Sequence, residues 1–229
     1  MSTPWYDTLG VFDLETTGID VTSSRIVSAH VGVIGPDGAV IEKREWLADP
    51  GIDIPVQASA VHGITTERAR AEGRPASEVV SEIVAAIAEL FSRDIPLTAY
   101  NAAYDLSLLH HEALRNGIDP LYDPSPVIDP LVIDKAVDRY RKGKRTLEIS
   151  AEFFGVDLTD AHDAGADAVA AGRVAQALAK KFPTELNIGA MELHTLQIGW
   201  AAEQAASFTD YMRRSGKPDF FDAGLWPVR

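Results

Sequence analysis

The sequence predicts an α/β fold in which helices cover the faces of a mixed sheet, followed by a C-terminal helical extension. Three strand-like runs come first, short strands then alternate with amphipathic helices, and residues 183–229 add a long helical pattern. A three-strand meander followed by alternating helices and strands predicts both antiparallel and parallel pairs, with the first strand in the centre. The length of 229 residues suits one sizeable domain with a buried core.

The first part of the sheet is expected to be an antiparallel meander. β-branched and other apolar residues are concentrated in residues 9–14, 25–34 and 39–47. The second and third runs are separated by the sequence Gly-Pro-Asp-Gly at residues 35–38, which favours a hairpin turn. The three runs therefore predict three sequential strands.

Amphipathic patterns and capping residues predict helices over much of the remaining chain. The expected helices are residues 75–91, 101–116, 130–140, 146–154, 164–182 and 189–214. Residues 96–100 and 127–129 are expected to form short strands between them. Residues 51–60 are interpreted as a loop, and residues 61–67 as a loop that enters a short helix through a threonine cap.

The composition excludes several classes of protein. A hydrophobic content of 46% with mixed charge excludes a disordered or fibrous chain, and the longest apolar stretch, residues 83–90, is too short to span a bilayer. The chain has no cysteine, which excludes disulfides and thiolate metal sites. The first ten residues lack the basic start and apolar run of a signal peptide, so we expect a soluble, cytoplasmic protein.

The formal net charge of −13 argues against broad, non-specific binding of duplex nucleic acid, because that affinity comes mainly from Lys and Arg. It does not exclude a nucleic-acid enzyme, since bound divalent cations bring positive charge to the point where phosphate reacts. Residues 139–145 form the one concentrated basic run. This run either holds phosphates of a nucleic-acid strand or is a solvated loop between helices.

The first expected strand ends in two carboxylates, Asp13 and Glu15. Side chains alternate between the faces of a strand, so these two point the same way and offer the oxygen ligands that hard divalent cations prefer. Two threonines and Gly18 follow, with small side chains and a residue that allows a sharp turn. About one Asp-x-Glu is expected by chance in a chain of this composition, so the pair alone also fits an ordinary charged strand end.

Two later stretches supply candidate partners for this pair. Asp105 falls in the first turn of the helix after residues 96–100, and His162 and Asp167 flank the start of the Ala-rich helix. Each has an ordinary structural explanation, because an acid in a first helical turn favours the macrodipole and a histidine near a helix start can cap or pack. A functional interpretation therefore depends on the whole set.

Taken together, these stretches resemble the DEDD superfamily of 3′-to-5′ exonucleases in its histidine subclass, the DnaQ-like group that includes the proofreading epsilon subunit of bacterial DNA polymerase III. The matching motifs are Phe12-Asp13-Leu14-Glu15-Thr16-Thr17-Gly18, Asn101-x-x-Tyr104-Asp105 and His162-x-x-x-x-Asp167. Their order makes the combined signal specific, although each motif alone would be weak. We therefore expect an exonuclease domain at residues 1–182 and a helical extension at residues 183–229.

The resemblance implies an RNase H-like fold with two Mg²⁺ or Mn²⁺ ions at the central strand. It implies that Asp13 bridges both ions, that Glu15 and Asp167 hold the ion that activates water, and that Asp105 supports the second ion largely through water. His162 is implied to be the general base, a role that an imidazole can fill near neutral pH. Phosphodiester hydrolysis explains these residue types, because hard ions take carboxylate oxygens and stabilise both the attacking and the leaving oxygen.

The resemblance also implies residues that contact the terminal nucleotide, namely Thr16, Gln57, His62, Asn101 and Tyr104. A glutamate is common in the family where Gln57 stands, and His62 could equally be a surface loop histidine. The expected activity is 3′-to-5′ removal of nucleotides from single-stranded or frayed DNA, with proofreading as a candidate role. The alternatives are an RNA-trimming exoribonuclease, because metal hydrolysis does not itself read the 2′-OH, and a catalytically silent interaction module.

The C-terminal extension has an amphipathic pattern. Its expected apolar stripe consists of Leu193, Leu196, Trp200, Phe208 and Met212. Because large apolar groups do not stay exposed in a soluble monomer, we favour packing of this helix on its own nuclease domain. The alternative is a docking surface for a DNA polymerase, a sliding clamp or a second copy, because the corresponding segment of the proofreading subunits binds the partner.

Overall fold

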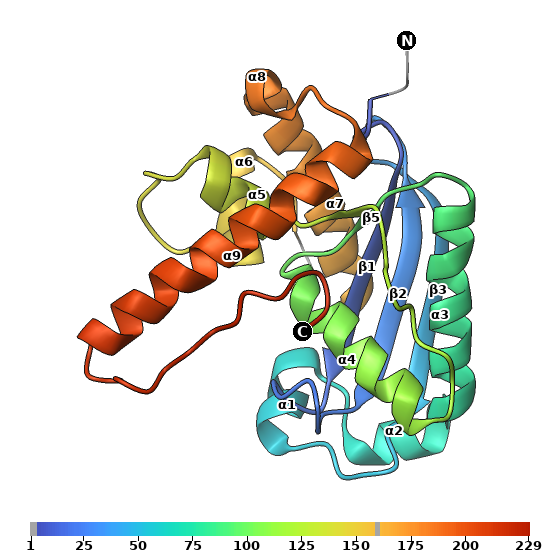
Figure 1. Ribbon diagram of the computed structural model, residues 1–229. Helices are drawn as coiled ribbons and strands as arrows, with labels where there is room; N and C mark the ends of the chain where they lie inside the picture. Colours follow the sequence, from blue (N-terminus) through green and yellow to red (C-terminus); the bar gives the residue numbers. More distant parts are fainter. Residues whose placement is uncertain (1–3, 159–160) are drawn as a thin grey trace.

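The computed structural model describes residues 4–158 and 161–229, and its centre is a six-stranded mixed sheet (Figure 1). The strands are β1 (Leu9–Thr16), β2 (Ile26–Ile34), β3 (Val40–Asp49), β4 (Arg74–Pro75), β5 (Leu97–Thr98) and β6 (Val127–Ile128). They lie in the order β4-β3-β2-β1-β5-β6. The pairs β1/β2 and β2/β3 are antiparallel, whereas β1/β5, β5/β6 and β3/β4 are parallel. The predicted mixed sheet with an interior first strand is confirmed.

Helices cover both faces of this sheet. They are α1 (Val56–His62), α2 (Thr66–Glu72), α3 (Ala76–Ser92), α4 (Ala102–Arg115), α5 (Pro130–Val137), α6 (Leu147–Phe154), α7 (Ala164–Lys181), α8 (Pro183–Leu186) and α9 (Ala190–Arg214). The helices α3 and α4 pack on one face, and α7 packs on the other, behind β1 in Figure 1. Among the described residues, no helix combines the length and apolar character that crossing a membrane requires.

The alternation of side chains along β1 decides where its carboxylates point. Val11 is buried in the cluster that contains α7, whereas Phe12 and Leu14 are buried in the cluster that contains α3 and α4. Because side chains alternate with a period of two, Asp13 and Glu15 continue the row of Val11. The acidic pair therefore lies on the α7 side of the sheet.

A close approach of α7 to the sheet brings a third acid to the same place. A Cβ at Gly172 would lie 2.6 Å from side-chain atoms of both Ile34 and Val11, so only glycine allows this contact. At the start of α7, the Asp163 carboxylate accepts hydrogen bonds from the Gly165 and Ala166 N–H groups and caps the helix. Asp167 follows in the first turn, next to the end of β1.

Some element boundaries differ from the prediction. Residues 56–62 form α1 rather than a loop, and no residue of this helix is buried, which explains why hydrophobic periodicity did not indicate it. The two-residue strand β4 and the single turn α8 were also not predicted. The helix α5 ends at Val137 rather than at residue 140. The Arg145 guanidinium donates to the carbonyls of Asp134, in its last turn, and of Asp138, which follows the helix.

The basic run at residues 139–145 is not a uniform phosphate-binding patch. Arg141 and Arg145 both form ion pairs with Asp134, and their side chains are almost fully buried. The Arg141 guanidinium also lies 4.5 Å from the centre of the Phe153 ring. These two arginines hold the segment onto α5 and α6, whereas Arg139 remains exposed.

The long helix α9 covers the open edge of the sheet at β6. The Val127 N–H donates to His194 Nδ1 (3.1 Å), and the Asp129 N–H donates to Gln197 Oε1 (2.7 Å). The Gln197 amide in turn donates to the Val127 carbonyl (2.9 Å). Side chains of α9 thus bond backbone groups that a further strand would otherwise have bonded.

This edge contact changes which face of α9 is buried. Leu193 is buried and Trp200 is partly buried, in agreement with the expected stripe. Leu196 and Phe208 are 40% and 47% exposed, so the stripe was wrong for these two residues. The buried face consists instead of Leu193, His194, Gln197, Ala205 and Thr209. Polar residues lie on this buried face because they form hydrogen bonds with the edge strand β6. A search for an apolar stripe cannot detect such residues.

Removing residues 183–229 should lower the melting temperature by roughly 10 °C or more and cause aggregation. The deletion removes three hydrogen bonds to β6 and the buried side chains of Leu193 and Trp226. Together these contribute about 5 kcal/mol or more to the free energy of unfolding. For a domain of this size, 1 kcal/mol corresponds to about 2–4 °C in melting temperature. Thermal melting and light scattering of the truncated protein provide the measurement, and Leu196→Ala, on the exposed face, serves as the control. An unchanged melting temperature would support the docking interpretation instead.

Candidate active site

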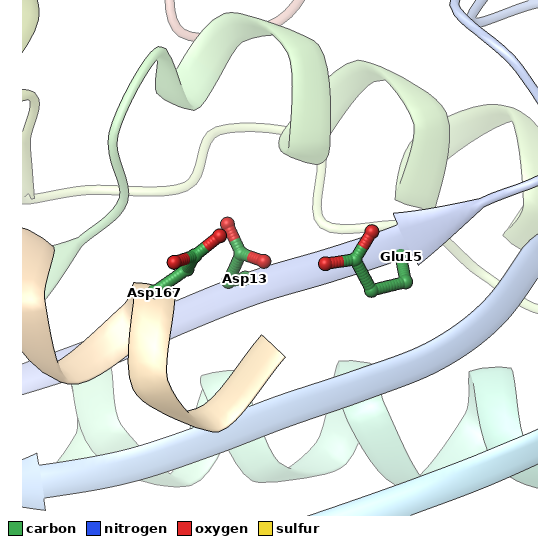
Figure 2. Close-up of side chains that lie close together, drawn as sticks. All are labelled: Asp13, Glu15 and Asp167. Carbon is green, nitrogen blue, oxygen red and sulfur yellow. The ribbon is translucent and has the colours of Figure 1, made fainter. Parts of the chain in front are cut away.

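Three carboxylates from two elements converge at the end of β1. Asp13 and Glu15 come from β1, and Asp167 comes from the first turn of α7 (Figure 2). One carboxylate oxygen from each lies within 4.8 Å of the others. The sequence placed these three acids in one site, and the structure brings them together.

The electrostatics of this cluster favour a bound cation. Burial raises the pKa of Asp13, and the negative charges of Asp105, Glu15 and Asp167 raise it further. Burial also raises the pKa of Glu15 to about 8, with Asp167 and Asp163 adding to the shift, and burial raises the pKa of Asp167. Asp167 Oδ1 is buried and has no hydrogen-bond partner among the described residues. Mutually repelling carboxylates with an unpaired buried oxygen are a donor set that fits a hard divalent cation.

Asp105 lies next to this cluster in the first turn of α4. Its side chain is buried. Among the neighbouring charges, the charge of Asp105 raises the pKa of Asp13 the most. Burial raises the pKa of Asp105, against hydrogen bonds from the backbone N–H groups of Asp105 and Leu14 that lower it. Asp105 is not one of the three acids whose oxygens lie within 4.8 Å of one another. This position fits indirect support of a cation.

His162 stands at the entrance to α7, beside the carboxylates. Its backbone adopts the left-handed region (φ 69°), and its N–H donates to Asp167 Oδ2 (3.2 Å). A non-glycine residue in this conformation costs about 1–2 kcal/mol, so this hydrogen bond helps to hold the turn. The imidazole Nε2 is 3.8 Å from Glu148 Oε1 on α6. The sequence did not indicate Glu148 as a neighbour of the candidate base.

A cavity of about 370 Å³ opens beside the acids. Glu15, His62 and His162 all line it, together with Trp46 and Arg68. The sequence-predicted histidines therefore share one cavity with a carboxylate of the cluster. Gln57 is exposed on α1 and does not contribute to the described wall of this cavity, so the structure does not bring it to the site.

Burial affects the charge of His62 in this wall. It lowers the pKa of His62, against the nearby Thr16 backbone that raises it, so burial favours the neutral ring. His62 Nδ1 accepts a hydrogen bond from the Ile64 N–H (3.1 Å). This hydrogen bond fixes the orientation of the ring next to the end of β1, unlike that of a surface histidine without partners.

The second motif contacts the first through Tyr104. The Tyr104 hydroxyl donates to the Gly18 carbonyl (2.5 Å) and lies 2.6 Å from Thr16 Oγ1. Asn101 precedes α4 in the left-handed conformation (φ 63°), with an exposed side chain. These contacts fix the start of α4 against the end of β1, so the candidate nucleotide-contacting residues Thr16, Asn101 and Tyr104 lie around the acids.

Sequence reasoning missed the buried residue that positions α4. Asp129, at the end of β6, accepts hydrogen bonds from the N–H groups of Asn101 (3.0 Å) and Ala102 (2.9 Å). It also caps α5 through the Leu131 N–H (3.0 Å) and contacts Trp226 Nε1 at 3.4 Å. The sequence indicated Asp129 only as the end of a short strand. The contact with Trp226, 97 residues away, has no local signal.

Comparisons with known proteins identify the family. The family model described as Exonuclease (RNase_T) matches residues 11–175. The chain is 31% identical over 173 residues to a DNA polymerase III subunit epsilon-like protein of Rhodobacter capsulatus, covering 71% of this chain and 22% of that protein. It is 26% identical over 182 residues to a PolC-type DNA polymerase III of Clostridium perfringens, covering 78% of this chain and 12% of that protein. The chain thus spans a quarter or less of the length of these relatives.

Solved structures show the same fold. Exonuclease I of E. coli, in complex with a dA16 oligonucleotide, has a TM-score of 0.67 and 23% identity, covering 79% of this chain and 42% of that chain. A moderately thermophilic exonuclease I from Methylocaldum szegediense has a TM-score of 0.62 and 21% identity, covering 79% of this chain and 42% of that chain. The predicted RNase H-like fold is therefore confirmed. With the family model matched over most of the chain, this protein belongs to the exonuclease family, within the group of DEDD nucleases that its three motifs resemble.

Proposed function

We propose that this nuclease removes nucleotides from the 3′ end of single-stranded or frayed DNA by hydrolysis that depends on two Mg²⁺ or Mn²⁺ ions. The observation that carries the proposal is the group of Asp13, Glu15 and Asp167, whose oxygens lie within 4.8 Å of one another. Their raised pKa values and the unpaired Asp167 oxygen support occupation by divalent cations rather than by protein donors.

The proposed roles combine the family resemblance with the grouping of the acids. Asp13 would hold both ions, Glu15 and Asp167 would hold the ion that activates water, and Asp105 would support the other from the start of α4. Such ions lower the pKa of a water and neutralise charge on the leaving 3′ oxygen. Thr16, Asn101 and Tyr104 surround the terminal nucleotide, and His62 faces it from the shared cavity.

His162 is the proposed general base. It lies on the solvent-accessible side of the carboxylates, in the wall of the cavity that contains Glu15. A neutral imidazole there can accept the proton of the attacking water. Glu148 Oε1 lies 3.8 Å from Nε2 of this ring. The protonated imidazole then releases its proton to solvent.

Activity should require a divalent cation and a free 3′ end. A 5′-labelled single-stranded oligodeoxynucleotide should be shortened in steps of one nucleotide in Mg²⁺ or Mn²⁺, and EDTA should abolish the reaction because the carboxylates alone cannot activate water. The measurement is a denaturing gel, with a 3′-phosphorylated oligonucleotide as the matched substrate control. Undiminished cleavage in EDTA would contradict the metal mechanism.

The physiological substrate and partners are also proposals. DNA is favoured because the relatives are named as components of DNA polymerase III. Matched DNA, RNA and mispaired-duplex substrates in the same assay separate a proofreading or single-strand nuclease from an exoribonuclease. A polymerase or sliding-clamp contact through residues 183–229 is a further proposal, and co-purification of the full chain with each candidate tests it.

A further inference from the structure

A second cavity lies between α5 and α9, the two helices that cross in Figure 1. Its volume is about 660 Å³. The wall consists of Lys135, Ala136, Arg139, Trp200, Glu203, Gln204, Ser207, Phe208, Tyr211 and Arg214. We call this feature the α5–α9 groove. It combines positive charge with exposed aromatic rings.

The cations of the groove are free to bind an anion. Lys135, Arg139 and Arg214 are exposed, and none forms an ion pair with a described residue. Nine other arginines pair with carboxylates. The groove contains one acid, Glu203, in a chain whose formal net charge is −13. A local excess of unpaired cations on an acidic protein is complementary to phosphate.

The aromatic residues form a stacked pair on the surface of α9. The rings of Phe208 and Tyr211 have centroids 6.5 Å apart and planes inclined by 20°. Phe208 is 47% exposed and Tyr211 is 58% exposed. Trp200, nearer the start of α9, lines the same groove. Partly exposed rings beside cations are the combination with which proteins bind single-stranded nucleic acid, since bases stack on the rings while phosphates contact the cations.

The groove continues toward the start of α4. A smaller cavity of about 150 Å³ shares Lys135, Gln204 and Phe208 with it. This smaller cavity extends to Asn101, which precedes α4 and the buried Asp105. From Trp200 to Arg214 the helix covers about 21 Å at 1.5 Å per residue, enough for several nucleotides of an extended strand.

We propose that the α5–α9 groove binds the single strand upstream of the terminal nucleotide while the 3′ end lies at the carboxylates. The proposal rests on the proposed exonuclease function and adds a second binding site for the same substrate. Arg139, Arg214 and Lys135 contact successive phosphates, and Phe208 and Tyr211 stack on bases. The consequence is a preference for long single strands over short ones.

Steady-state kinetics with substrates of increasing length test this proposal. The substrates are the p-nitrophenyl ester of thymidine 5′-phosphate, a trinucleotide and a 16-nucleotide single strand. Phe208→Ala/Tyr211→Ala should raise KM about 10-fold on the 16-mer, as expected for a lost stacking contact. Arg139→Ala/Arg214→Ala should reduce the slope of log KM against log salt concentration by about 0.7 for each lost phosphate contact. Both effects should become smaller as the substrate is shortened and should disappear on the ester.

The controls are Tyr122→Ala and Lys180→Ala, which remove an exposed ring and an exposed cation outside both cavities. An equal rise in KM on all three substrates, or no rise on the 16-mer, would overturn the proposal. If KM on the 16-mer does not rise, a protein is the better candidate occupant of the groove. Fluorescence anisotropy with the labelled 16-mer separates the two hypotheses. If the wild type hydrolyses nothing but binds the 16-mer through these residues, the groove stands and the exonuclease function fails.

Discussion

Replacing Asp13 with asparagine should reduce the rate of 3′-end hydrolysis by about 10³-fold or more while leaving the fold intact. Asp13 lies at the centre of the acidic cluster, between Glu15 and Asp167. Charge stabilisation by bound cations contributes several kcal/mol to hydrolysis, and 1.36 kcal/mol corresponds to a factor of ten in rate. Asparagine keeps the size of the side chain but removes the charge that binds the ions.

The same substitution should stabilise the protein in EDTA at alkaline pH. Burial and neighbouring charges raise the pKa of Asp13, and burial raises the pKa of Glu15 from 4.5 to about 8. A carboxyl group whose pKa is raised by folding stabilises the fold when it is protonated, below its unfolded pKa, and this contribution is lost as pH rises through the folded pKa. The melting temperature of Asp13→Asn should therefore exceed that of the wild type at pH 9 and approach it near pH 4.

Melting by circular dichroism and a gel assay in Mg²⁺ measure these two effects. Asp119→Asn, at an exposed acid away from the cluster, is the matched control and should change neither. Loss of cooperative melting in Asp13→Asn would show that Asp13 is a structural residue rather than a ligand. Full activity would contradict its proposed role directly.

His162→Ala should lower kcat by about 10² to 10⁴, the range typical of a lost general base, while Mn²⁺ binding is retained. The imidazole lies in the wall of the cavity with Glu15, whereas its backbone N–H, which bonds Asp167, survives the substitution. Gel assays give kcat, and calorimetric titration with Mn²⁺ measures the metal affinity. A simultaneous loss of metal binding would show that the residue organises the carboxylates instead.

The pH dependence should report the carboxylate ligands. The wild-type rate should fall toward acid pH because protonated carboxylates cannot bind metal, and burial raises the pKa of Asp13, Glu15 and Asp167. His162→Ala leaves the carboxylates in place, so its remaining rate should still fall toward acid pH. His111→Ala, at a partly exposed histidine on α4, should keep the wild-type profile.

The grouping of the three acids could be predicted from local patterns that are weak alone but specific in their order. The period of two along β1 places Asp13 and Glu15 on one face, and the capped start of α7 places Asp167 one turn in. The order of the three motifs then connected positions far apart in the chain. The mixed sheet with β1 inside followed from the succession of strands and helices.

What could not be predicted depends on contacts between distant segments. Asp129 anchors α4 only because the chain brings residues 101 and 102 beside the end of β6. His194 and Gln197 are buried because they bond a strand edge, which reverses the usual relation between polarity and exposure. The helix α1 has no buried residue, so no periodic signal existed to find.

The contact between α9 and β6 also has a consequence for synthesis of the protein. Translation proceeds from the N-terminus, so β6 leaves the ribosome more than sixty residues before the side chains of His194 and Gln197 that bond it. During that interval the strand edge is available to any other extended chain, including a neighbouring nascent copy. Slow elongation after residue 182 should therefore lower the yield of native protein, and a chaperone that shields exposed strand edges should restore it.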